Sequence, residues 1–420
     1  MHENLLLVVE TDSGTILREI TPPTPLAADR PRGVAAEDAS RRAVEIWGLP
    51  DFVLEPLEES AAGRSREVSD GIIFLGTRAI MLQSKSRAES SGEADRERGW
   101  LDKNIARALR QAAGSVRALR SRSRTMSNRR GNSVEVHGDE IDWLTVVLID
   151  HDEVPAGYTP DSGEERAVVL TRGDWEFLFD HLRSATWVLD YLDRVVGEPF
   201  ELGREPVRYY EIAASDDLAD AGDLPAWGAN GRTHAWAGRA PLEPAGHAET
   251  EAHFLLRSVQ EDIGRTEIGR ERELERLEVL RHLDGIPVGL RVEVGRRVLE
   301  FVDATRKWRR ATLATRTRVI LPGSARSAGV DGPLMFMAAS ELTPTSEAVF
   351  RTRAELLHHD FGLESGWEGY RTTGVLLTPS SDHQKAWTTS MVTAQGNLDL
   401  DPSYVTELRR YHDVTRVDVL

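Results

Sequence analysis

The chain has 420 residues, of which 40% are hydrophobic and 29% charged, the composition of a globular protein with roughly two to three domains. It contains no cysteine, which excludes disulfides, thiolate zinc sites, iron–sulfur clusters and a cysteine nucleophile. The net charge of −17 argues against a surface that binds nucleic acid everywhere, although it is compatible with a local basic groove. No apolar run reaches the length of a membrane span, so we expect a cytoplasmic protein without membrane contact.

The start of the chain, residues 1–34, predicts a small appendage. Residues 4–20 hold two β-rich runs on either side of an Asp-Ser-Gly turn, which predicts a hairpin. Four prolines between residues 22 and 31 then favour a linker, because proline interrupts helices and strand ladders alike.

Residues 35–160 predict an α/β domain in which a mixed sheet is flanked by helices. The apolar spacing predicts, in chain order, a short helix, a tight β-hairpin, a long helix, a polar loop and a central buried strand. These elements cover residues 35–47, 70–85, 95–119, 121–133 and 143–150. We expect residues 161–420 to form a larger α+β region that is regulatory or binds substrate or a partner, with one helix over 174–195.

The hairpin carries three polar side chains that can meet at one edge of the sheet. Gln83 and Lys85 are two residues apart on one strand and therefore project from the same face. The tight turn at Gly76-Thr77 sets a register that puts Asp70 across from about Gln83. We therefore expect a carboxylate, an amide and an ammonium group to converge.

This trio suits phosphodiester hydrolysis. Mg²⁺, or Mn²⁺ in its place, prefers oxygen ligands, which Asp70, the side-chain carbonyl of Gln83 and the backbone carbonyl of Ser84 could supply. The metal would polarise the phosphate and activate a water, while Lys85 would orient that water and neutralise charge on the phosphoryl oxygens. The alternative is that these are ordinary polar residues at strand ends, although the apolar residues beside them indicate a buried hairpin.

The arrangement resembles the PD-(D/E)XK nucleases, the restriction-endonuclease-like superfamily, in the variant where glutamine replaces the acidic residue, as in Mrr-type restriction enzymes. The resemblance rests on Asp70, Gln83 and Lys85 and is confined to residues 35–160. It implies a core of helix, three-stranded meander, helix and strand, which agrees with the order above. It also implies a magnesium-dependent endonuclease that acts on double-stranded DNA.

Members of this superfamily often add a glutamate from the first helix. The resemblance implies Glu37 or Glu45 for this role, and the sequence does not choose between them. Glu67, three residues before Asp70, could supply another carboxylate if the strand bends there.

A basic run supports a polyanionic partner. Between Lys103 and Arg130 the chain has nine basic and no acidic residues. Rows of arginine and lysine neutralise phosphates and hold the register of a duplex, whereas the alternative is an ordinary solvated helix face. Five of the nine recur at helical spacing, which predicts one shared face: Lys103, Arg107, Arg110, Arg117 and Arg124.

The sequence therefore predicts a metal-dependent nuclease that cleaves DNA. By analogy with restriction enzymes, we expect it to act in defence against foreign DNA. Restraint by the C-terminal region or by a partner protein is expected, and a homodimer would supply the two sites needed to cut both strands. The alternative is a nuclease-fold scaffold or nucleic-acid-binding subunit without catalysis, which Gln83 in place of an acid favours.

Overall fold

The computed structural model describes most of the chain, which divides into two compact units. Unit 1 comprises Met1–Thr233, Arg239–Pro244 and Gly269–Leu277, and unit 2 comprises His234–Gly238, Ala245–Ile268 and Glu278–Leu420. Glu67, one of the predicted carboxylates, lies outside the described residues. Those residues are 5–11, 14–56, 70–163, 166–218, 240–242, 246–307, 315–320, 332–365, 370–380, 385, 387–412 and 417–419.

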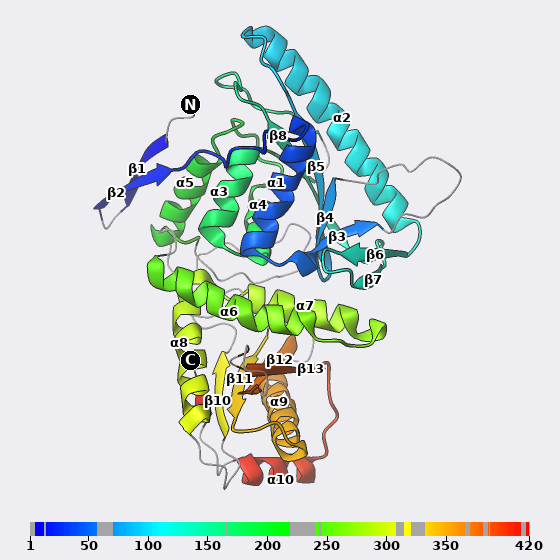
Figure 1. The fold of residues 1–420 in the computed structure, drawn as a ribbon, viewed down its shortest axis with the longest axis vertical. Helices are drawn as coiled ribbons and strands as arrows, with labels where there is room; N and C mark the ends of the chain where they lie inside the picture. The colour runs from blue at the N-terminus through cyan, green and yellow to red at the C-terminus, as the bar shows by residue number, and fades with distance from the viewer. Residues whose placement is uncertain are drawn as a thin grey trace. The chain divides into compact units, whose positions relative to one another are not determined.

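A mixed sheet, with seven strands in the described residues, forms the centre of unit 1 and confirms the prediction of a sheet flanked by helices (Figure 1). Its strand order is β7-β6-β3-β4-β5-β8-β9. β4 and β5 are antiparallel neighbours, whereas β8 is parallel to β5 and β9 is parallel to β8. The sheet therefore continues past residue 160. The strands are β3 (Val53–Pro56), β4 (Gly71–Leu75), β5 (Arg78–Ser86), β6 (Arg124–Asn128), β7 (Ser133–Val136), β8 (Asp142–Asp150) and β9 (Ala167–Thr171).

Helices cover both faces of this sheet, which is why the predicted central strand is buried from Trp143 to Asp150 and mostly apolar. On one face, α2 (Ala94–Arg120) packs Leu101 and Ile105 against Val147 and Ile149 of β8. On the other face lie α1 (Arg32–Trp47) and α3 (Arg172–Leu182), whose first residues both bind Asp150. Figure 1 shows α2 on one side of the strands and α1 with α3 on the other.

The prediction of one helix over 174–195 is wrong, because the chain turns at Arg183. This residue has a left-handed backbone with φ of 51°, and it ends α3. Ser184 then caps α4 (Ala185–Val195) by accepting a hydrogen bond from the backbone of Trp187 at 3.1 Å. The Arg183 guanidinium lies over the Trp47 ring, 4.3 Å from its centroid, so a tertiary contact supports the break.

The prediction of a polar loop over residues 121–133 is also wrong. It contains β6, whose Met126 and Asn128 are buried, and β7 begins directly after the turn at its end. β6 pairs with β3, a short strand that the sequence pattern does not reveal. Because β6 pairs with a strand that is distant in the chain, no pattern in its own sequence indicates that it is buried.

The predicted N-terminal hairpin is present as β1 (Leu5–Thr11) and β2 (Gly14–Ile20), paired in full antiparallel register. It packs against α5 (Glu205–Leu218), with Val9 buried. Its outer face exposes three large aliphatic side chains, Leu6, Val8 and Leu17.

Unit 2 is a second mixed α and β structure, with a five-stranded sheet in the described residues of order β13-β12-β11-β10-β14. β10 and β11 are antiparallel, and β12 is parallel to β11. Within the described ranges, no helix is both long and apolar enough to cross a membrane. The strands are β10 (Thr315–Ile320), β11 (Leu334–Ala339), β12 (Arg371–Pro379), β13 (Trp387–Gln395) and β14 (Val417–Val419), and the helices are α6 (His247–Arg265), α7 (Glu273–Asp284, shared with unit 1), α8 (Val288–Lys307), α9 (Pro344–Ser365) and α10 (Pro402–His412).

Candidate functional site

The hairpin β4–β5 brings the predicted trio to one end of the sheet. Gly71 pairs with Leu82, so Asp70, one residue earlier, lies opposite Gln83. Opposite residues of antiparallel strands project from the same face, and Lys85 shares that face because it follows Gln83 by two.

This face is the one that α2 covers. Gln83 and Lys85 pair in register with Val147 and Ile149 of the parallel strand β8, and these two residues belong to the core under α2. Ser84 and Ser86 point to the opposite face, where Ser86 donates a hydrogen bond to Asp150 at 3.0 Å.

Asp70 and Lys85 are close enough to act together. The Lys85 Nζ atom lies 4.0 Å from Asp70 Oδ2, and the same oxygen accepts a hydrogen bond from the backbone N–H of Ser84 at 2.6 Å. Lys85 Nζ also donates to the Ser84 carbonyl at 3.0 Å. The carbonyl expected as a metal ligand is therefore occupied by Lys85 in this conformation. Both charged side chains remain in contact with solvent, with 17% of Asp70 and 20% of Lys85 exposed.

Gln83 is the most buried member of the trio. Only 4% of the residue is exposed, and its amide makes no hydrogen bond within the part of the chain that the structure describes. The amide atoms themselves reach solvent, so the oxygen is available to a ligand.

The first helix anchors Asp70 from the opposite face, through residues that sequence analysis did not single out. Arg41 of α1 donates to the backbone carbonyl of Asp70 at 2.8 Å and to Asp38 at 2.7 Å. The hydrogen bond from Arg41 lowers the pKa of Asp38, against a smaller opposite effect of burial.

The expected helix glutamates do not join the trio. Glu37 and Glu45 both belong to α1, which lies on the face opposite Gln83 and Lys85, and Glu45 forms an ion pair with Arg129 at 2.9 Å. For Glu37 the structure records no contact with Asp70, Gln83 or Lys85 in the described residues.

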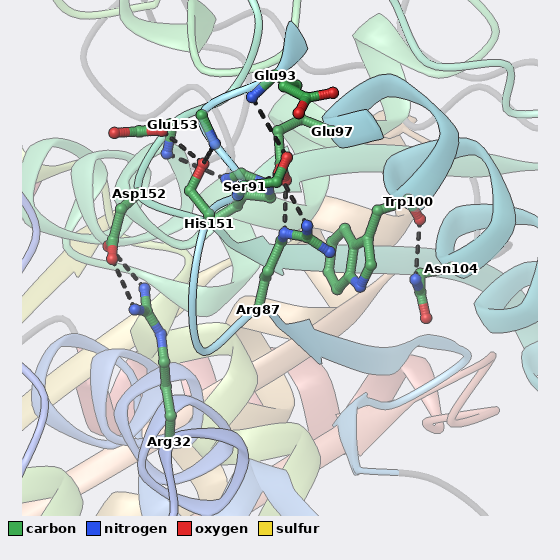
Figure 2. A network of polar contacts seen from close by, with 12 residues as sticks. Arg32, Arg87, Ser91, Glu93, Glu97, Trp100, Asn104, His151, Asp152 and Glu153 are labelled. Atoms are coloured by element: carbon green, nitrogen blue, oxygen red, sulfur yellow. Dashed lines mark hydrogen bonds and ion pairs between the residues drawn. The ribbon is translucent and has the colours of Figure 1, made fainter. Parts of the chain in front are cut away.

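A buried network lies on the α2 face, just after the end of β5. Figure 2 shows this network around Glu97. Glu97, from the first turns of α2, binds Arg87 and His151, which follow β5 and β8. Sequence analysis missed Glu97, although it precedes the core residue Leu101 by four. A carboxylate on the core side of a helix needs a partner, and that pattern could have identified it.

A second network lies on the α1 face. Asp150, at the end of β8, accepts from Arg32 at 2.6 Å and from Arg172 at 3.1 Å. Burial raises the pKa of Asp150, but these two arginines outweigh it and lower the pKa below the ordinary value. Arg32 also forms a bidentate pair with Asp152, seen in Figure 2. This cluster joins α1, α3 and β8.

Four of the five predicted nucleic-acid contacts form one exposed row on α2, on the side away from its buried residues: Lys103, Arg107, Arg110 and Arg117. Arg124 does not continue the row, because α2 ends at Arg120 and Arg124 begins β6. Arg129 and Arg130 form ion pairs with carboxylates of the protein, so their side chains stabilise the fold.

Two pockets of unit 1 are formed by other residues than the trio. Cavities of about 350 and 960 Å³ are present there, and neither is lined by Asp70, Gln83 or Lys85. The described residues also contain no group of three or more His, Asp or Glu side chains arranged to hold a metal. Any cation at the trio would have one protein carboxylate, Asp70, and one amide, Gln83, among the described residues.

No family model matches the chain, and no curated protein or solved structure matches it either.

Proposed function

We propose that this protein is a metal-dependent nuclease that hydrolyses phosphodiester bonds of DNA. The observation that carries the proposal is the convergence of Asp70, Gln83 and Lys85 on one face of β4 and β5, with Lys85 Nζ 4.0 Å from Asp70. A carboxylate, an amide oxygen and an ammonium group at this spacing suit a hard cation beside a phosphate.

The order of elements around the trio supports a restriction-endonuclease-like fold. α1 is followed by β3, β4 and β5, which are antiparallel neighbours, then by α2 and, after the additional strands β6 and β7, by β8, which is parallel to β5. This is the helix, meander, helix and strand that the resemblance to Mrr-type enzymes implies, and that resemblance makes restriction of foreign DNA the setting.

The donor set fits Mg²⁺ or Mn²⁺, with Asp70 and the oxygen of Gln83 as the residues that would hold it. When bound, the ion would supply Lewis-acid activation of a phosphate and of a water. Asp70 is oriented by the Ser84 N–H and, through its backbone, by Arg41. Lys85, with its ammonium group partly exposed, can donate to the attacking water and to a phosphoryl oxygen.

The identity of residue 85 supports this role. The chain has 52 basic residues, yet lysine occurs at four positions only: 85, 103, 307 and 385. Arginine would be the ordinary partner for a carboxylate in this chain. A lysine offers a compact charge with rotatable donors, which suits a site that must hold a small water and a phosphate oxygen together.

The surroundings support a polymeric substrate. Asp70 and Lys85 are both partly exposed to solvent, as contact with a backbone phosphate of a large substrate requires. The exposed row on α2 supplies positive charge for phosphates in a chain of net charge −17. Concerted cutting of both strands would need two sites, so we expect two copies on one duplex.

The proposal is tested by replacing Lys85 with alanine. Plasmid and linear DNA are incubated with Mg²⁺ or Mn²⁺, and the single-turnover cleavage rate is measured. Because Lys85 stabilises charge that develops during attack, we expect Lys85→Ala to lower the rate by about 100-fold or more.

The matched control is Lys385→Ala, which removes a lysine that pairs with Asp262 at 2.7 Å in unit 2 and should leave cleavage unchanged. Equal cleavage by the wild type and by Lys85→Ala would remove the assigned role.

A second candidate is a nuclease-fold scaffold or nucleic-acid-binding subunit without catalysis. The observation that favours it is the single carboxylate at the trio, since Gln83 is a neutral ligand. Calorimetric titration with Mn²⁺ separates the two: heat that disappears in Asp70→Ala supports the enzyme, and no heat in the wild type, with or without DNA, supports the scaffold.

A further inference from the structure

The buried network beside the trio continues the same row of side chains. Arg87 follows Lys85 by two residues, and its backbone N–H donates to the Asp150 carbonyl at 3.0 Å, which extends the pairing of β5 with β8. Gln83, Lys85 and Arg87 therefore project from one face of the sheet at successive pleats. Arg87 is the next residue of that row, one pleat beyond Lys85.

Glu97 connects this row to α2 and to the segment after β8 (Figure 2). Its carboxylate binds Arg87 Nε at 2.5 Å and Nη2 at 2.8 Å, and it accepts from both the N–H and the hydroxyl of Ser91. His151 Nε2 lies 2.6 Å from Glu97. Glu97 is 2% exposed, so these groups replace its water shell.

Glu97 is the negatively charged group of this network. Burial by itself raises the pKa of Glu97, but the hydrogen bonds from Ser91, His151 and Arg87 outweigh it and lower the pKa to about 2. His151 Nδ1 accepts from the backbone N–H of Glu153 at 3.0 Å, which assigns the proton of a neutral ring to Nε2 and makes His151 a donor to Glu97. An ionised Glu97 thus joins three segments: the loop after β5, α2 and the loop after β8.

We propose that Glu97 is a positioning residue for Lys85, an inference that rests on the proposed nuclease function. Lys85 reaches Asp70 through a long flexible side chain, so the position of its ammonium group depends on how firmly the end of β5 is held. Asp70 holds the strand before Lys85 through the Ser84 N–H, and Glu97 holds it after Lys85 through Arg87. Loss of the second anchor lets the strand end move, and misplacement of a catalytic group by about 1 Å can cost roughly 100-fold in rate.

The test is a double-mutant cycle in the full chain: wild type, Glu97→Gln, Lys85→Ala and the double variant. Single-turnover cleavage is measured with Mn²⁺, and DNA affinity is measured separately. We expect Glu97→Gln to lower the rate about 10- to 100-fold when Lys85 is present, with DNA affinity unchanged, and less than about 2-fold in the Lys85→Ala background.

A matched control is Asp216→Asn, which removes another buried carboxylate, one whose partners Arg194 and the Ala240 N–H lie outside β5. It should lower the melting temperature at least as much as Glu97→Gln, yet its effect on the rate should be the same with and without Lys85. Equal effects of Glu97→Gln in both backgrounds would overturn the positioning role, whereas a Lys85→Ala variant as fast as the wild type would overturn the proposed function instead.

Lysine labelling gives a readout that needs no catalysis. With four lysines in the chain, acetylation at each position can be followed by mass spectrometry. We expect Glu97→Gln to speed acetylation of Lys85 several-fold and to leave Lys385 unchanged. Unchanged labelling of Lys85 in a folded Glu97→Gln protein would contradict the proposal, even if cleavage were too slow to compare.

Discussion

The two units contain the same local arrangement with different side chains at its end. In unit 1, β4 and β5 form a hairpin, α2 follows, and β8 returns parallel to β5. In unit 2, β10 and β11 form an antiparallel pair, α9 follows, and β12 returns parallel to β11. The end of β5 carries Gln83 and Lys85, whereas the end of β11 reads Ala338-Ala339-Ser340.

The two units therefore share a strand and helix topology but differ in the side chains that could carry out chemistry. The two arrangements share the order and pairing of their elements, and in unit 1 the strand end carries the charged pair Asp70 and Lys85. The helices differ as well: the outer side of α2 carries basic residues in a row, while α9 mixes Glu347, Arg351, Glu355 and Asp360. We therefore expect catalysis and nucleic-acid binding to depend on unit 1 and to be insensitive to equivalent changes in unit 2.

The largest effect should come from Asp70. Asp70→Asn removes the one carboxylate of the trio, and we expect cleavage to fall on the order of 1000-fold or more. The measurement is single-turnover cleavage of a labelled duplex, with Asp262→Asn of unit 2 as the control. Comparable losses in the two variants would mean that Asp70 acts only through folding, which would end the distinction between the units.

A smaller effect is expected from the row on α2. The double variant Arg107→Glu and Arg110→Glu places like charge beside phosphates, so DNA affinity should fall about 10-fold or more and the salt dependence of binding should weaken by about two ions. Fluorescence anisotropy over a series of salt concentrations measures the DNA affinity and the number of ions released on binding. Arg351→Glu on α9 should change neither value, and an equal loss there would show that net charge alone governs binding.

The smallest effect is on acid stability, and here the units should behave alike. Burial lowers the pKa of His181 in unit 1 to about 4 and, with help from Arg353, lowers that of His412 in unit 2 to about 4. Between pH 6.5 and 4 the unfolded chain binds protons that the folded chain does not, so stability is fully present above pH 6.5 and falls as the pH drops to about 4. We expect His181→Asn and His412→Asn each to reduce this fall in melting temperature by a few degrees.

The control for that experiment is the exposed His137 of unit 1, whose replacement by asparagine should leave the slope of melting temperature against pH as it is. A slope unchanged in His181→Asn and His412→Asn would show that other groups dominate the acid response.

Much of the trio was predictable because the hairpin is local. Leu75 and Arg78 flank a two-residue turn in which Gly76 has φ of 72°, a backbone conformation that glycine adopts without strain. Such a turn sets the register, and the register puts Asp70 across from Gln83. The Glu97 network could not be derived in the same way, since its partners Arg87 and His151 lie 10 and 54 residues away along the chain.

The sequence by itself determined the α/β class of unit 1, the N-terminal hairpin, the pairing at residues 70–85 and the run of basic charge on a long helix. These are properties of neighbours in the chain, where periodicity and turn chemistry act directly. Only the tertiary structure decided that α1 anchors Asp70 from behind, that Arg124 leaves the basic row, and that Glu97 joins two loops beside Lys85. Those outcomes depend on which distant polar groups become buried together, and burial of a charge is decided by its partners in space rather than by its neighbours in sequence.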